Sequence, residues 1–559
     1  MKKSLCIIYS LLLLTLLWTT ITCKPVEQTG DDPLSEKTDK LFSEWDKPDS
    51  PGASLAVIKD GSVIYKAGYG SAQLEYSIPI TPSTVFHVAS VSKQFTAFAI
   101  TMLADQGKLS LDDDIHKHLP EIPDFGKTVT IRHLIHHISG IRDQWELLAM
   151  AGWRLDDVIT KEHILKMVKH QRDLNFEPGA EYLYCNTGFT LMAEIVARVT
   201  GQSFREWTEK NIFKPLGMSN TQFYDDHERI VKNRAYSYAK DNDKGFKKRV
   251  LSYANVGATS LFTTAEDLAK WLLNFEEKRV GGSAIIEQVH KQGVLNNGKE
   301  ISYAFGLIIG EHKGLRTVGH GGADAGYRSN VMHFPEQKFG VVVLSNLANF
   351  NPSSLARQVA EVYLADQIKE EEKEGEKTVK VDRKVLDSYT GKYKLKAGPV
   401  VTIARERNRL VAKAGDEVKV ELIPESETKF FVKEIDAHIT FQRTESEKAS
   451  RFILHQGEED IPAQRIEPPT LNPKQLAEFA GDYYSEELGT TYTIVVQDEQ
   501  LVAQHRRHDD IKLNPTDMDQ FVGEQWFFSQ VQFTRDKEKK LTGFLLTGSR
   551  VRNLRFDKQ

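Results

Sequence analysis

A run of charges at 369–380 (KEEEKEGEKTVK) constrains the fold of this 559-residue chain more than any other feature. The run contains one apolar residue, Val379, so it cannot bury itself in a core and predicts a solvated linker. Hydrophobic cores stop growing at roughly 250–300 residues, so a chain of this length splits into domains. We therefore expect a first domain at 33–367, a charged linker at 368–382, and further domains after it.

The segment before the linker predicts an α/β sandwich. Apolar and polar residues alternate over Ser54–Ile58 and Ser62–Tyr69, on either side of Lys59-Asp60-Gly61, which is typical of a hairpin. Strands are also expected late in the segment, so the sheet is assembled from both ends of the domain. The expected helices are 34–45, 90–106, 131–136, 161–170, 187–200, 265–275 and 352–365, and the late strands are 327–333 and 339–345.

The segment after the linker contains an internal repeat. Leu386–Tyr393 (LDSYTGKY) is echoed by Leu476–Tyr483 (LAEFAGDY), and Ile439–Arg443 is echoed by Val531–Arg535 at a similar offset. A period of about ninety residues is too long for a solenoid unit. Short strands separated by turn residues instead predict two small all-β barrel-like domains. We assign them to 383–467 and 472–559.

The first residues predict export. Lys2 and Lys3 precede a mainly apolar run, Leu5–Trp18, which is short for a membrane span and typical of a signal peptide at 1–23. Thr20–Cys23 resembles a lipoprotein-processing site, in which Cys23 would carry the lipid and attach the protein to a membrane. A transmembrane anchor is the other alternative. We expect an exported, periplasmic or extracellular protein, with lipid anchoring through Cys23 left open.

Charge and cysteine content argue against a nucleic-acid-binding protein and against a fold held by disulfide bonds. The net charge is 73 − 78 = −5 and there is no basic block, which argues against nucleic acid as a partner. Three cysteines, Cys6, Cys23 and Cys185, cannot form a disulfide framework. We expect a small-molecule or peptide substrate and no cofactor, with the oligomeric state left open.

Ser90-Val91-Ser92-Lys93 forms an S-x-x-K motif. Residues three apart share a helix face, so Lys93 can place its amine beside the Ser90 hydroxyl. The stretch that follows is apolar nearly all round, which predicts a buried helix with Ser90 at its N-terminus, where free N–H groups favour a developing oxyanion. Ser426 and Lys429 have the same spacing in a polar β-rich stretch, so spacing alone does not identify the nucleophile.

A serine hydroxyl needs a base, and Tyr184-Cys185-Asn186 offers a tyrosine with an amide two residues later. Tyrosine titrates near about 10, so it acts as a base only where a cation such as Lys93 stabilises the phenolate. Tyr253 and Asn255 have the same form. We prefer Tyr184 because it lies between a turn and a predicted helix.

A histidine and two glycines, His320-Gly321-Gly322, precede Ala323 and a predicted strand. The glycines would allow a substrate to approach the backbone and pair with the strand edge. His312-Lys313-Gly314 has a related form, without the glycine pair.

Three histidines, His133, His136 and His137, lie in one predicted helix, so a metal site must be weighed. No glutamate completes an H-E-x-x-H pattern, and packing or hydrogen bonding is the favoured role, so no metal site is predicted. Cys185 is expected to be a small buried thiol rather than a nucleophile, since no partner histidine is evident in the local sequence.

Taken together, these segments resemble the serine β-lactamase and penicillin-binding protein superfamily, in its class C-like branch with D-aminopeptidases and esterases. The resemblance covers about residues 47–365 and favours Ser90, Tyr184 and His320 over their alternatives. It rests on FHVASVSKQFTAF (86–98), TIRHLIHHISGI (130–141), YCNTGFTL (184–191), IFKPLGMSNT (212–221), GATSLFTTAEDLAKW (257–271) and HGGADAGYRS (320–329).

The resemblance implies an antiparallel sheet flanked by helices and an acyl-enzyme mechanism. Ser90 would be the nucleophile, with Lys93 and Tyr184 handling its proton. Asn186 would orient the substrate or Lys93, and the oxyanion would lie between the N–H groups of Ser90 and Ala323. The substrate-binding residues expected on this basis are Asn186, His320, Gly322 and Ala323.

His320 stands where many β-lactamases have a lysine in a K-T-G strand. A neutral imidazole attracts a substrate carboxylate less strongly than an ammonium does, which favours amide, D-amino-acid peptide or ester substrates over β-lactams. A class C-like β-lactamase and a catalytically weak cell-wall or partner binding protein are the alternatives. Two β-barrels resemble those of D-aminopeptidases, and no residue from Leu386 to Gln559 receives a role by resemblance.

Overall fold

A computed structural model describes residues 33–369, 379–395, 400–414, 418–432, 437–443, 448–456 and 459–559. The predicted signal peptide at 1–23, including Cys23, lies outside the described residues. So does most of the predicted charged linker, since 370–378 are not described.

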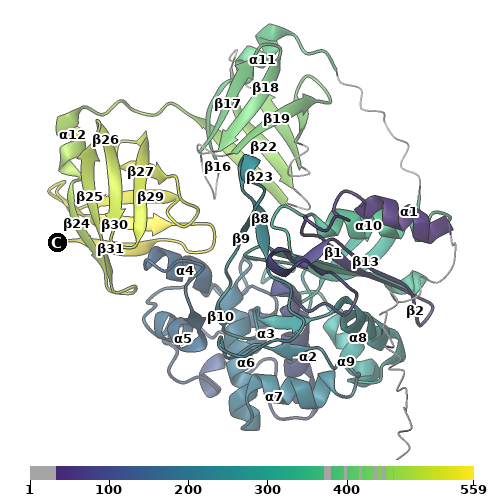
Figure 1. The fold of residues 1–559 in the computed structure, drawn as a ribbon. Coiled ribbons are helices and arrows are strands. Elements are labelled where there is room, and N and C mark those ends of the chain that lie inside the picture. Colours follow the sequence, from purple (N-terminus) through teal and green to yellow (C-terminus); the bar gives the residue numbers. More distant parts are fainter. Residues whose placement is uncertain are drawn as a thin grey trace, which may run out of the picture.

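A six-stranded antiparallel sheet forms the centre of the first domain (Figure 1). Its order is β12-β13-β14-β15-β1-β2, so strands from the start and the end of the domain meet at its centre, where Ala53 pairs with Ser345 and Lys59 with Phe339. The strands are β1 (Ala53–Lys59), β2 (Ser62–Tyr69), β12 (Ile308–His312), β13 (Leu315–Asp324), β14 (Tyr327–Phe334) and β15 (Phe339–Ser345).

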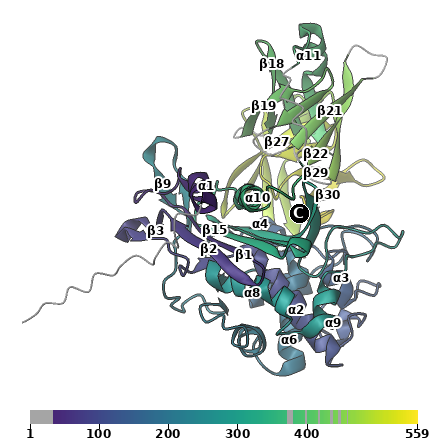
Figure 2. The same cartoon turned by 90° about the vertical axis from the view of Figure 1, so that its right-hand side faces the viewer.

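Both faces of this sheet are buried, and each carries its own core. In β1, Leu55 and Val57 pack with α1 (Pro33–Phe42) and α10 (Pro352–Tyr363). Ala56 and Ile58 face the other way, into the core that holds α2 (Ser92–Asp105) and α8 (Ala265–Glu277). Strand side chains alternate between faces, so a continuous apolar run fills two cores. Figure 2 shows the sheet between these two pairs of helices.

The helices near α2 form the larger layer of the first domain. Nearly all of α2 is buried, as its apolar sequence predicts, and it packs against α6 (Asn186–Thr200). The remaining α-helices are α3 (Ile131–Ile135), α4 (Gln144–Met150), α5 (Lys161–Lys169), α7 (Phe204–Thr208) and α9 (Gly282–Val289). Short strands complete the domain: β3 (Ser71–Gln73), β4 (Ile78–Pro79), β5 (Phe86–His87), β6 (Ile159–Thr160), β7 (Gln222–Phe223), β8 (Tyr238–Lys240), β9 (Phe246–Lys248), β10 (Tyr253–Ala254) and β11 (Leu261–Thr263).

The sequence repeat corresponds to two closed eight-stranded barrels, each preceded by a short helix, α11 (Arg383–Tyr389) or α12 (Pro473–Glu478). The first barrel comprises β16 (Gly391–Leu395), β17 (Val400–Glu406), β18 (Arg409–Ala414), β19 (Val418–Pro424), β20 (Lys429–Val432), β21 (Ala437–Arg443), β22 (Ala449–Gln456) and β23 (Glu459–Ile466). The second comprises β24 (Gly481–Ser485), β25 (Thr490–Gln497), β26 (Gln500–His505), β27 (His508–Asp517), β28 (Gln520–Gly523), β29 (Gln530–Arg535), β30 (Leu541–Thr547) and β31 (Leu554–Lys558).

The repeated tyrosines explain why the repeat is visible in the sequence. Tyr393 donates its hydroxyl to the Tyr389 carbonyl at 2.8 Å, and Tyr483 donates to the Phe479 carbonyl at 2.8 Å. All four rings are buried, so each repeat fixes a helix end against the first strand of its barrel. Among the described residues the first and last strands of each barrel pair with one another, β16 with β23 and β24 with β31, which closes the sheets as the all-β prediction implied.

The second barrel packs against α4 and the residues around it (Figure 1). Arg142 and Glu487 form an ion pair at 2.6 Å across this contact, with their side chains only 1% and 5% exposed. Glu487 also accepts from the Arg172 N–H at 3.0 Å, and Tyr492 donates to the Met150 carbonyl at 3.1 Å. Buried polar groups of the barrel therefore find hydrogen-bond partners in the first domain.

No helix among the described residues is both long and apolar enough to cross a membrane.

We expect Glu487→Gln to destabilise the docked second barrel by about 3–5 kcal/mol, because it leaves the buried Arg142 charge without its counter-ion. Glu486→Gln is the matched control, since Glu486 pairs with Arg172 where both side chains are largely exposed. That pair should contribute about 1 kcal/mol or less. Urea unfolding followed by tryptophan fluorescence measures both variants, and equal losses would contradict the prediction.

Candidate active site

Ser90 lies at a tight turn between a strand and a buried helix. The turn is a 3₁₀ segment, Ala89–Val91, that follows β5 and leads directly into α2. Ala89 has a φ of 47°, in the left-handed region that non-glycine residues rarely adopt. This conformation holds the partly exposed Ser90 immediately before α2, at its N-terminal end.

Lys93 is fully buried and directed at Ser90. Its Nζ donates to Ser90 Oγ at 3.0 Å, to Asn186 Oδ1 at 2.8 Å and to the Ala258 carbonyl at 2.8 Å. Burial lowers the pKa of Lys93 to about 7, against the opposing attraction of nearby carboxylates. An amine in this state can accept a proton from Ser90 near neutral pH.

Tyr184 contacts the same two groups. It hydrogen bonds with Ser90, and Lys93 Nζ lies 4.9 Å from the centre of its ring. Burial raises the Tyr184 pKa far above its ordinary value, although the Ser90 hydrogen bond and the charge of Arg550 oppose the rise. Tyr184 is therefore a neutral phenol in this structure, and Lys93 is the group that titrates near neutral pH.

Asp143 fixes Asn186, and the sequence analysis did not identify it. Asp143 Oδ2 accepts from the backbone N–H of Asn186 at 2.7 Å and from its side-chain Nδ2 at 2.8 Å. This leaves the Asn186 carbonyl oxygen directed at Lys93. Asp143 also caps α4, and an aspartate before a helical segment was the signal that could have drawn attention to it.

The sequence suggested that His320 and Gly322 precede a strand. In the structure they lie within strand β13, together with Ala323. The partner strand β12 ends its pairing at Gly319, which leaves the following residues available on that edge. A Cβ at Gly322 would lie 3.0 Å from Ser90 N and 2.3 Å from the Val88 carbonyl oxygen. Glycine therefore lets β13 approach the Ser90 turn and brings the neighbouring Ala323 toward it.

His320 is buried and neutral. It exchanges a hydrogen bond with the Tyr303 hydroxyl at 3.1 Å through Nε2. Burial, with a smaller contribution from the charge of Lys93, lowers its pKa to about 3. The strand thus presents no positive charge at this position.

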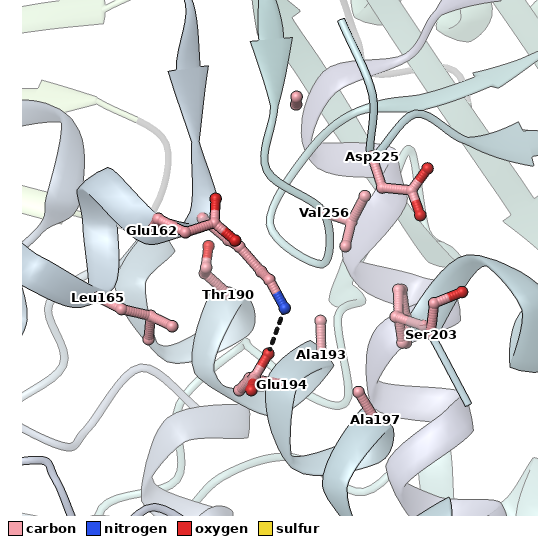
Figure 3. A pocket seen from close by; sticks show the side chains of 12 residues that line it. Glu162, Leu165, Thr190, Ala193, Glu194, Ala197, Ser203, Asp225 and Val256 are labelled. Atoms are coloured by element: carbon pink, nitrogen blue, oxygen red, sulfur yellow. Dashed lines mark hydrogen bonds and ion pairs between the residues drawn. The ribbon is translucent and has the colours of Figure 1, made fainter. Parts of the chain in front are cut away.

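These residues open into one cavity of about 600 Å³. Ser90, Tyr184 and Asn186 line one part of it, and β13 lines another. Arg550, from the second barrel, also lines it, although the sequence analysis assigned no role to that barrel. A separate pocket of about 150 Å³, between α5 and α6, contains the Lys161–Glu194 ion pair and none of the predicted site residues (Figure 3).

The alternative candidates lie elsewhere or have structural partners. Ser426 accepts backbone N–H bonds in a turn of the first barrel, and Tyr253 stacks on Trp145 with ring centres 4.5 Å apart. Burial raises the pKa of Cys185 to about 12, so it is a protonated thiol. His312 pairs with Glu361, His133 and His136 bond to backbone groups, and His137 accepts from the Cys185 N–H.

Comparison with known families covers most of the chain. Residues 38–364 match the family described as Beta-lactamase, and residues 376–468 match a domain of unknown function (DUF3471). Penicillin-binding protein 4* of Bacillus subtilis (strain 168) is 27% identical over 436 residues, which cover 74% of this chain and 95% of that protein. A D-aminopeptidase of Gluconobacter oxydans (strain 621H) is 30% identical over 296 residues, 53% of this chain and 56% of the relative's length.

Solved structures give the same fold. An octameric penicillin-binding protein homologue from Pyrococcus abyssi has a TM-score of 0.55 at 26% identity, covering 77% of this chain and 99% of that chain. A D-amino acid amidase from Ochrobactrum anthropi SV3 has a TM-score of 0.51 at 21% identity, covering 60% of this chain and all of that one, and shows the fold alone. The predicted fold class, an α/β sandwich followed by two barrels, is confirmed. The chain belongs to the Beta-lactamase family, and the prediction that it is a β-lactamase-related serine hydrolase is confirmed.

Proposed function

We propose that this chain is an exported hydrolase that forms an acyl-enzyme on Ser90 and acts on small amides, D-amino-acid peptides or esters. One observation carries the proposal: a buried amine, Lys93, lies 3.0 Å from the Ser90 hydroxyl with its pKa lowered to about 7. Such an amine is a base at neutral pH, which a serine nucleophile requires.

The proposed reaction follows from the positions of these groups. Ser90 Oγ attacks the substrate carbonyl carbon as its proton passes to Lys93 Nζ, and the oxyanion forms beside the N–H groups of Ser90 and Ala323. The bond to the leaving nitrogen or oxygen then breaks, and the neutral phenol of Tyr184 passes a proton to the leaving group. Lys93 then passes the proton that it took from Ser90 to the Tyr184 phenolate, which restores both groups. Water attacks the resulting ester and gives a proton to Lys93 Nζ, which passes it to Ser90 Oγ as the acid is released.

The relatives support amide substrates. The curated relatives include D-aminopeptidases, and the structural neighbours include a D-amino acid amidase. His320 on β13 is neutral, so this strand offers no positive charge to the carboxylate of a β-lactam. A β-lactamase activity is therefore the second hypothesis. Comparing turnover of a D-alanyl amide and a cephalosporin separates the two.

Export rests on the sequence of residues 1–23 alone. We expect protein recovered from a host with a general secretory pathway to begin at Lys24, or at a lipidated Cys23, because the apolar run is typical of a cleaved signal. Intact-mass spectrometry and N-terminal peptide mapping measure this. Protein that retains Met1–Cys23 in the cytoplasm would contradict the proposal.

We expect a fluorophosphonate probe to add once to the mature protein, on Ser90. Its rate should rise with pH through about 7, because protonated Lys93 cannot accept the Ser90 proton below that pH. Ser90→Ala should abolish the adduct. Ser426→Ala, in the second S-x-x-K sequence, is the matched control and should label at the wild-type rate. A folded protein that shows no adduct at Ser90 would overturn the acyl-enzyme proposal.

Gly322→Ala should slow acylation of Ser90 by roughly 100-fold, because a small misplacement of reacting groups has an effect of that order. The added Cβ would lie 2.3 Å from the Val88 carbonyl oxygen and force β13 away from the Ser90 turn. Gly321→Ala is the control, since its Cβ would meet its nearest neighbour at 3.5 Å. Probe-labelling rates measure both, and a Gly321→Ala variant slowed as much as Gly322→Ala would contradict the argument.

A further inference from the structure

The second barrel extends one loop, between β30 and β31, into the active-site cavity. Glu146 of α4 accepts from the backbone N–H groups of Ser549 at 2.7 Å and Arg550 at 2.6 Å. A Cβ at Gly548 would lie 2.2 Å from Glu146 Oε1, so a side chain there would displace the carboxyl from the loop. The buried carboxyl of Glu146 thus holds the loop by its backbone.

The other side of the loop is fixed as well. The Arg550 carbonyl accepts from Asn175 Nδ2 at 2.8 Å and from the Asp143 N–H at 3.3 Å. Asn175 Oδ1 accepts in turn from the Arg552 N–H at 2.8 Å. Both backbone polar groups of Arg550 are therefore used for docking, and its side chain is free to serve the cavity.

The guanidinium of Arg550 lies over Tyr184, 5.0 Å from the centre of the ring, and lines the cavity. Within the described part of the chain it has no hydrogen bond or ion pair to another side chain. The other arginine of the cavity, Arg328, donates to the carbonyls of Ala325 and Tyr327 and is attracted by Asp324. Arg550 is half-buried and its backbone is held on both sides, so its planar guanidinium is placed at the cavity, where it suits recognition of a planar anion.

The other charged groups of the site are not placed to bind an anionic substrate. Lys93 is enclosed by Ser90, Asn186 and the Ala258 carbonyl, and His320 is neutral. Asp324 is held by a hydrogen bond from Thr259. Arg328 already donates to two carbonyls and is attracted by Asp324, whereas the Arg550 guanidinium pairs with no other side chain among the described residues, so a carboxylate in the cavity meets Arg550 with all of its donors unused. Tyr184 is the proposed proton donor to the leaving group. The Arg550 guanidinium lies over the Tyr184 ring, so it is near the part of the substrate that leaves.

We propose that Arg550, contributed by the second barrel, is the carboxylate-binding residue of this active site. It selects amides whose leaving amine carries a free carboxylate, such as the last residue of a short peptide, by paired N–H···O bonds from the guanidinium to the two carboxylate oxygens. The inference deepens the proposed function and rests on it for turnover, whereas the binding step does not require an active nucleophile.

A different role for Arg550 makes a different prediction. The charge of Arg550 lowers the pKa of Tyr184, so the competing hypothesis is that Arg550 assists proton transfer and does not bind the substrate. In that case its removal would slow acidic and neutral substrates equally and leave ligand binding unchanged.

The test measures binding in a Ser90→Ala background, where no turnover occurs. N-acetyl-D-alanyl-D-alanine and its C-terminal amide are titrated by calorimetry into Ser90→Ala and into Ser90→Ala with Arg550→Gln. We expect the acid to bind more tightly than the amide to the parent. Arg550→Gln should weaken the acid roughly 10- to 100-fold, the range for a hydrogen bond to a charged group, and the amide much less. Arg550→Lys should retain part of the preference.

Arg552→Gln is the matched control on the same loop. Its guanidinium contacts the Phe176 ring and Glu181 rather than the cavity, so acid binding should match the parent. Equal affinity for acid and amide in the parent, no binding of the acid, or an equal loss for both ligands with Arg550→Gln would overturn the inference. Failure of the proposed function is recognised separately, by the absence of a probe adduct on Ser90.

Discussion

The candidate active site depends on the burial of the Lys93 amine. Moving an ammonium out of water is costly unless every N–H finds an acceptor, and here Ser90, Asn186 and the Ala258 carbonyl supply three. Those acceptors come from the turn before α2, the start of α6 and the segment before β11. Because the remaining burial cost lowers the pKa of Lys93 to about 7, the arrangement that buries the amine also makes it a base.

One short segment couples this site to the second barrel. Asp143 holds Asn186 through its carboxylate and the Arg550 carbonyl through its backbone N–H. Beside it, Arg142 pairs with Glu487, and Glu146 binds the loop that carries Arg550. Burial raises the pKa of Glu146 to about 7, and its carboxyl oxygens accept from the backbone of the barrel loop. The barrel is thus part of the site's construction.

Local patterns predicted much of this structure, because they depend on neighbours in the chain. The three-residue spacing of Ser90 and Lys93, the hairpin at Asp60 and the repeated tyrosines each act within one or two elements. Asp143 had a local signal as a helix cap, but its hold on Asn186 and the position of Arg550 could not be found in this way, since both arise where distant segments meet. The neutral state of Tyr184 was also hidden, because it follows from burial that the sequence does not express.

The separation of the proposed catalytic amine, Lys93, from the proposed substrate-binding cation, Arg550, has an electrostatic reason. A second ammonium at position 320 on β13 would lie in the same buried region as Lys93, and like charges there lower an amine's pKa further. A neutral His320 avoids that repulsion. Arg550 lies instead 5.0 Å from the centre of the Tyr184 ring, and its effect on the pKa of Lys93 is smaller than the opposing effects of Asp324 and Asp143. A positive charge for the substrate and a near-neutral base can therefore coexist because they come from different domains.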